Sequence, residues 1–158
     1  MILPRGITGF NVPKGSAEAD PGSFRADCWQ VVAPLSGRAE DRPQVLCPAC
    51  TSFLTQVLVL PRRAVTVLLN KVHPWIGFCR PLEPGDCWLE FVDPGTVAAR
   101  FTALGRYRVL SREELDQPVD SSMVAELGSG ESSQLAYWSK LAGRGKLRVG
   151  EVIFNFWD

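Results

Sequence analysis

The sequence predicts an α+β fold, with a mostly antiparallel sheet of about five to six strands and two or three helices packed on one side. Three apolar, β-branched or aromatic runs lie within residues 51–93, separated by breaks that contain proline, as expected of adjacent strands. At 94–104 the apolar spacing changes to that of a helix. The expected element order, β-β-β-α-β-α-β-β, is typical of an antiparallel or mixed sheet with its helices gathered together.

The strands are expected where apolar residues alternate or run continuously. Residues 53–60 are apolar on both faces, which is typical of a central strand, and residues 64–71 return after a turn at 61–63. Residues 75–79 continue this run beyond a kink at His73 and Pro74. The remaining strands are predicted at 28–32, 87–92, 106–110, 134–138 and 147–157.

The most clearly marked helix follows Asp93, which is placed to cap it. Val97, Phe101 and Leu104 form an i, i+4, i+7 stripe that would cover one face of the sheet. Gly105 is placed to end the helix.

Two shorter helical segments are expected next. Ser111 and Glu114 have the spacing of a capping box, which predicts a helical turn. Asp120 is placed to cap a short helix at 121–127, and a loop is expected at 128–133.

We expect residues 1–158 to form a single domain, because a chain of this length buries roughly two-thirds of its unfolded surface. Within it, residues 1–26 are rich in Gly, Pro, Ser and Asp and are expected to form an irregular N-terminal arm on an α+β core at 27–158. The 17 basic and 17 acidic side chains give zero formal net charge, which argues against binding to nucleic acid.

From these residues we expect no targeting signal. Its start, MILPRGITGF, lacks the regions of a secretory signal, and no stretch is apolar enough to predict a membrane span. The five cysteines are an odd number and too sparse for a disulfide scaffold. These features predict a cytoplasmic protein with reduced thiols.

The pair Cys47 and Cys50 has the one spacing that suits a metal or redox site. A closed zinc site needs two further ligands, which the other cysteines or His73 would supply only if the fold brought them near. We interpret the cysteines as structural or incidental, with zinc at Cys47 and Cys50 as the alternative. His73 is the only histidine and is interpreted as a packed or hydrogen-bonded side chain.

No P-loop, dinucleotide-binding, serine-hydrolase or metalloprotease motif is present, so we expect no enzyme activity and no cofactor. An acidic segment at 113–126 is expected to face a basic one at 140–148. Such runs are usually solvated faces, but they also form charged surfaces that steer a partner of opposite sign. The candidate partner-binding residues are Glu113, Glu114, Asp116, Asp120 and Glu126. Five tryptophans are many for this length, and one or two left exposed would mark an interface.

Several segments together resemble a family of small, mostly uncharacterised bacterial proteins: LPRGITGF at 3–10, LLNKVHPWIGFC at 68–79, LEFVD at 89–93, YRVLSREEL at 107–115, QLAYW at 134–138 and VGEVIFNFWD at 149–158. Members are often associated with bacterial toxin systems. The resemblance implies an immunity-type protein that neutralises a cognate toxin domain by direct binding, and it assigns no functional residue. The alternative is a small enzyme or a ligand- or zinc-binding domain that uses His73 and the cysteines. The binding face and oligomeric state stay open.

Overall fold

The computed structural model describes residues 1–10, 12–40, 51–83, 86, 88–141 and 147–156. The described helices are α1 (Pro21–Val32), η1 (a short 3₁₀ helix, Ala33–Leu35), α2 (Thr96–Ala103), α3 (Arg112–Asp116), α4 (Ser129–Leu141) and α5 (Val149–Ile153). The described strands are β1 (Arg38–Glu40), β2 (Phe53–Leu60), β3 (Arg63–Asn70), β4 (Trp75–Cys79) and β5 (Arg108–Val109).

The described strands form one sheet in the order β1-β2-β3-β4-β5. Three neighbouring pairs are antiparallel, and β4 with β5 is parallel. The longest pairing joins β2 to β3, from Phe53 opposite Asn70 to Leu60 opposite Arg63. The α+β class, the mostly antiparallel sheet and the predicted hairpin are therefore confirmed.

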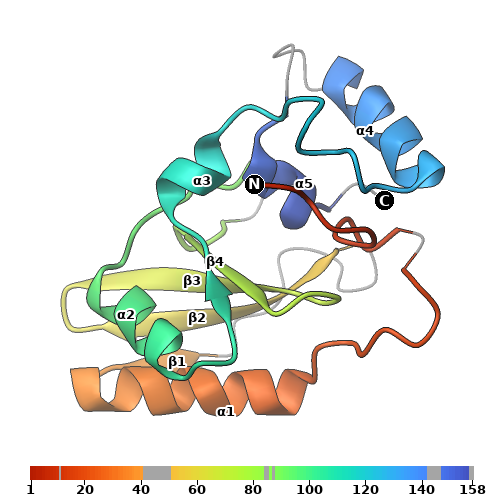
Figure 1. Ribbon diagram of the computed structural model, residues 1–158. Helices are drawn as coiled ribbons and strands as arrows, with labels where there is room; N and C mark the ends of the chain where they lie inside the picture. Colours follow the sequence, from red (N-terminus) through yellow and green to blue (C-terminus); the bar gives the residue numbers. More distant parts are fainter. Residues whose placement is uncertain (11, 41–50, 84–85, 87, 142–146, 157–158) are drawn as a thin grey trace.

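The helices cover both faces of the sheet, whereas the sequence predicted them on one side (Figure 1). Strand β3 explains why. Val67 and Leu69 pack into the cluster that includes α1 and α2, while Leu68 between them packs into the cluster that includes α3 and α5. Because successive side chains of a strand point to opposite faces, an apolar run such as β3 needs a layer on each side.

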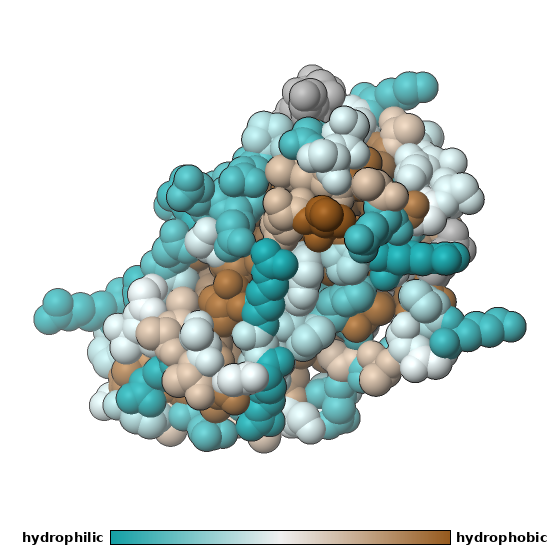
Figure 2. All heavy atoms as spheres, in the orientation of Figure 1, coloured by the Kyte–Doolittle hydropathy of each residue, from teal (hydrophilic) through white to brown (hydrophobic). Residues whose placement is uncertain are grey.

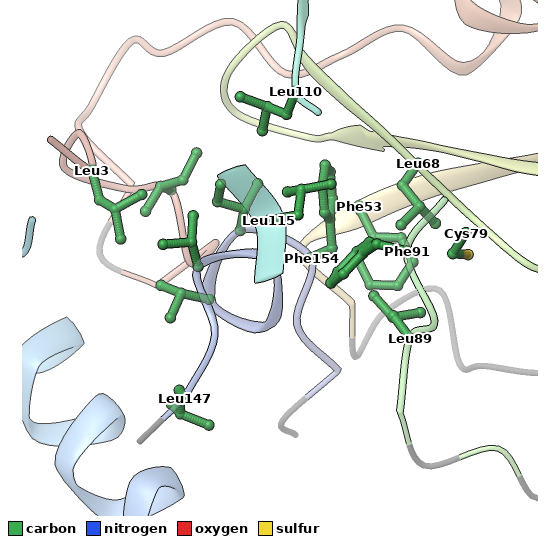
Figure 3. Packing of buried hydrophobic residues seen from close by; sticks show 14 of the residues in the cluster. Leu3, Phe53, Leu68, Cys79, Leu89, Phe91, Leu110, Leu115, Leu147 and Phe154 are labelled. Atoms are coloured by element: carbon green, nitrogen blue, oxygen red, sulfur yellow. The ribbon is translucent and has the colours of Figure 1, made fainter. Parts of the chain in front are cut away.

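The cluster that includes α3 and α5 is built around aromatic rings. Phe154 packs edge-on against Phe53, with ring centroids 6.0 Å apart, and lies 6.4 Å from the ring of Phe91. Figure 3 shows these rings beside Leu115 of α3. Gly77 of β4 lies beneath them, because a Cβ at that position would come within 2.6 Å of Cε2 of Phe154. The small residue lets α3 and the C-terminal segment approach the sheet.

Two predictions are wrong at helix α1. Residues 21–26 were expected in the irregular N-terminal arm and 28–32 in an edge strand, but both segments are helical. The Asp20 side chain accepts the Ser23 backbone N–H at 2.7 Å, and Pro21 occupies the first helical turn. Both features start a helix. Phe24, Cys28 and Val31 then face the core at helical spacing. The helix signal is therefore present in the sequence, although the helix ends in two β-branched residues, Val31 and Val32, which are also common in strands.

The predicted strands at 134–138 and 147–157 are also wrong, because these residues contribute to α4 and α5. All five residues of α5 are buried, and the Phe154 N–H donates to the Gly150 carbonyl at 2.9 Å, which is the i to i−4 hydrogen bond of a helix. Residues 128–133, predicted as a loop, include the first residues of α4.

The smaller differences concern the ends of elements. The segment 88–92 makes only an isolated bridge at Phe91, residues 106–110 contribute the two-residue strand β5, and 121–127 forms turns instead of a helix. Strand β1 was not predicted. Helix α2 is confirmed, with Val97 and Phe101 buried, although its N-cap is Gly95. The capping box of Ser111 and Glu114 is confirmed.

Candidate functional site

A groove lies between α4 and the turn at 119–124, and the N-terminal segment runs beside this turn. The Leu3 backbone N–H donates to the Met123 carbonyl at 2.7 Å. On the other side of the turn, the Val119 N–H donates to the Leu147 carbonyl at 2.8 Å, and Pro118 forms a β-bridge with Arg148. The turn is therefore held by two distant parts of the chain.

Glu131, in the first turn of α4, fixes the N-terminal segment to this helix. Its fully buried carboxylate accepts the Gly6 N–H at 3.0 Å, the Thr8 hydroxyl at 2.9 Å and the Gly128 N–H at 2.9 Å. These donors satisfy a charge that would otherwise be strongly disfavoured by burial. No local pattern could predict this role, since Gly6 and Thr8 lie more than a hundred residues earlier.

The groove itself is mostly apolar and has a volume of about 190 Å³. Ser132, Ser139 and Asp120 are its polar lining residues. Figure 2 shows apolar side chains gathered in the upper half of one face, around the position of the N-terminus in Figure 1. Ile2, which adjoins the bond between Leu3 and Met123, is 56% exposed. The apolar lining consists of Val119, Val124, Leu135, Ala136 and Leu147.

Asp120 places a negative charge at this groove. Its carboxylate accepts the Ser122 N–H at 2.8 Å and the Met123 N–H at 3.1 Å, which stabilises the turn. The hydrogen bonds from Ser122 and Met123 lower the pKa of Asp120, so its side chain is ionised at neutral pH. Glu126 is exposed on the same stretch of chain.

The structure divides the five predicted acidic residues into two groups. Glu114 caps α3 and lies 3.4 Å from the Arg108 guanidinium, and Asp116 pairs with Arg112 at 3.1 Å and with Arg148 at 2.8 Å. These two carboxylates stabilise the fold. The other three, Glu113, Asp120 and Glu126, are exposed and form no ion pair with any described residue. They are the carboxylates that a partner can reach.

The predicted basic and acidic segments meet at Arg148, which forms an ion pair with Asp116. Its guanidinium contacts Asp116 and Glu151, each at 2.8 Å, donates to the Leu89 carbonyl at 3.0 Å and lies 5.3 Å from the ring centre of Phe91. These contacts hold α3 and α5 together. Residues 142–146 of the basic segment lie outside the described residues.

The described cysteines and His73 do not come together. Cys28 belongs to the cluster with α1 and Cys79 to the cluster on the opposite face of the sheet. Burial raises the pKa of Cys79 to about 12 and raises that of Cys28 further, so both remain protonated and poorly nucleophilic. The His73 Nε2 atom lies 3.1 Å from the Arg5 carbonyl oxygen, as its packed interpretation expects.

The other thiols, Cys47, Cys50 and Cys87, fall outside the described residues, and with them the candidate zinc pair. In the described part of the chain, no three or more His, Cys, Asp or Glu side chains are arranged to hold a metal ion. Two tryptophans, Trp29 and Trp88, are about two-fifths exposed, and a role for them in an interface stays a prediction.

A search of the described helices for a membrane span found none that is sufficiently long and apolar. Comparison with known protein families found no matching family model, and comparisons with curated proteins and solved structures found no significant match.

Proposed function

We propose that this chain is a non-enzymatic, cytoplasmic binding protein of the immunity type, which neutralises a cognate toxin domain by occupying it directly. The observation that supports the proposal is the apolar groove between α4 and the turn at 119–124, together with the exposed carboxylates of Glu113, Asp120 and Glu126, of which Asp120 lines the groove. The partner is a protein with a basic surface beside an apolar side chain.

The two parts of this surface have different tasks. An apolar side chain that enters the groove is removed from water and supplies most of the affinity, as in the centre of protein interfaces. Exposed carboxylates at the edge contribute less affinity, but they accelerate association with a basic partner and disfavour acidic ones. Inhibition by contact requires no catalytic group.

The groove is also pre-organised for binding. The Leu3–Met123 and Val119–Leu147 backbone bonds hold the turn, and the Glu131 carboxylate holds the N-terminal segment against α4. A surface fixed in this way loses little conformational entropy when the partner binds, so more of the contact energy remains as affinity.

Co-expression with the toxin encoded beside this gene tests the proposal. The unaltered protein should restore growth, whereas the double variant Asp120→Lys with Glu126→Lys should protect less and should associate with the purified toxin more slowly, by on the order of tenfold at low salt. Glu18→Lys is the matched control, because Glu18 is exposed on the N-terminal arm and forms no ion pair with a described residue.

Folding of each variant is verified by its circular dichroism and its urea midpoint. Persistent growth inhibition despite good expression of the unaltered protein contradicts the immunity function. Equal protection by the double variant and the unaltered protein contradicts the assignment of this surface.

A further inference from the structure

We propose a second docking site at the turn between β2 and β3, which binds an acidic segment of a partner protein that carries an apolar anchor residue. The site is a hollow of about 490 Å³ between this turn, η1 and the start of α2. In Figure 1 the turn and α2 lie at the left, whereas α4 lies at the upper right. The site is therefore separate from the groove described above.

The floor of the hollow is apolar and firmly held. Leu35 of η1, Leu60 at the end of β2, the following Pro61, and Val97 of α2 line it. Val97 is 1% exposed and belongs to the core cluster, while Leu35 and Leu60 are only partly buried. Because Leu60 is paired with Arg63 across the hairpin, the sheet fixes one wall and α2 fixes the other.

Two arginines provide the charge. Arg62 and Arg63 also line the hollow, both are exposed, and neither forms an ion pair with a described residue. The Arg63 guanidinium donates to the Pro94 carbonyl at 3.2 Å, which keeps it at the edge of the hollow. The described lining contains no carboxylate. A guanidinium group binds a carboxylate through two parallel hydrogen bonds. We therefore expect carboxylates of the partner to bind Arg62 and Arg63.

The combination of features selects the class of partner. A nucleic acid would need many phosphate contacts, and two arginines above an apolar floor do not supply them. A small anion would leave the partly exposed side chains of Leu35 and Leu60 in contact with water. A leucine or phenylalanine flanked by glutamates uses both features at once. This proposal does not depend on the toxin-neutralising function, because none of the residues that line this hollow lines the groove between α4 and the turn at 119–124.

The test uses the full chain and a fluorescein-labelled peptide of sequence EELFEE, with KKLFKK and EESSEE as control peptides. We expect EELFEE to bind and to shift the amide resonances of Leu60, Arg62, Thr96 and Val97, with an affinity that falls as ionic strength rises. The control peptides should bind on the order of tenfold more weakly, because each lacks one of the two features.

Arg62→Glu should lower the affinity for EELFEE by on the order of tenfold, and Lys14→Glu should leave it unchanged, since Lys14 is exposed on the N-terminal arm. The variant Asp120→Lys with Glu126→Lys should also bind EELFEE normally, which separates this site from the toxin-binding surface. The proposal is overturned if EELFEE fails to bind, if KKLFKK binds equally well, if the shifted resonances map elsewhere, or if Arg62→Glu behaves like Lys14→Glu.

Discussion

The contact between Gly77 and Phe154 allows a quantitative test of the packing. In Gly77→Ala the added Cβ would lie 2.6 Å from Cε2 of Phe154 and 3.0 Å from Cδ1 of Leu115. The side chains must therefore move, and such overpacking lowers the free energy of unfolding by about 1–3 kcal/mol. Alanine recovers part of this because glycine is disfavoured in a strand interior by roughly 0.5–1 kcal/mol.

Removing the ring of Phe154 should relieve the overpacking caused by Gly77→Ala. Phe154→Ala deletes a fully buried side chain and should lower the free energy of unfolding by about 3–5 kcal/mol. In the double variant the new methyl group at residue 77 enters the space that the ring has left. The effect of Gly77→Ala should then fall to near zero, which corresponds to a coupling energy of about 1–2 kcal/mol between the two positions.

Urea unfolding followed by tryptophan fluorescence and circular dichroism measures all four proteins of this cycle. Gly22→Ala is the control substitution, because a Cβ there would meet only Asp20 oxygens, at 3.4 and 3.9 Å, on the exposed start of α1. It should show no coupling to Phe154→Ala. Strict additivity of Gly77→Ala and Phe154→Ala would refute the packing inferred between β4 and the C-terminal segment.

Two further predictions concern polar groups. Glu131→Ala leaves the Gly6 and Thr8 donors without their acceptor and should lower the free energy of unfolding by about 1–3 kcal/mol. Hydrogen exchange at Gly6 should accelerate more than exchange in β3, and equal acceleration would contradict a local role. Asp20 has a pKa below its usual value because the Ser23 N–H donates a hydrogen bond to its carboxylate. Its contribution to the free energy of unfolding is therefore fully present above the unfolded pKa of about 4, and it is lost as the pH falls through the lower pKa of the folded protein. The difference in urea midpoint between the unaltered protein and Asp20→Ala should therefore shrink between neutral pH and about pH 3, and a constant difference would contradict this.

The elements that can be predicted from the amino-acid sequence are those whose signals are local. The hairpin of β2 and β3 follows from two apolar runs around a short turn, and α2 follows from Val97 and Phe101 one helical turn apart. Ser111 and Glu114 form their capping box within a single turn of chain. In each case the interacting residues lie within a few positions of one another, so spacing alone identifies the contact.

The remaining features depend on contacts between residues far apart in the chain, which only the folded protein forms. Whether residues 149–153 form a strand or a helix depends on which side chains the sheet buries, and their β-branched composition favoured the wrong choice. The residues of the candidate site are still farther apart in the sequence. Glu131 meets Gly6 across 125 positions, and Arg148 takes up Asp116 while Asp120 stays exposed. A linear sequence shows that these charges exist, but only the folded chain determines which of them are neutralised internally and which remain for a partner.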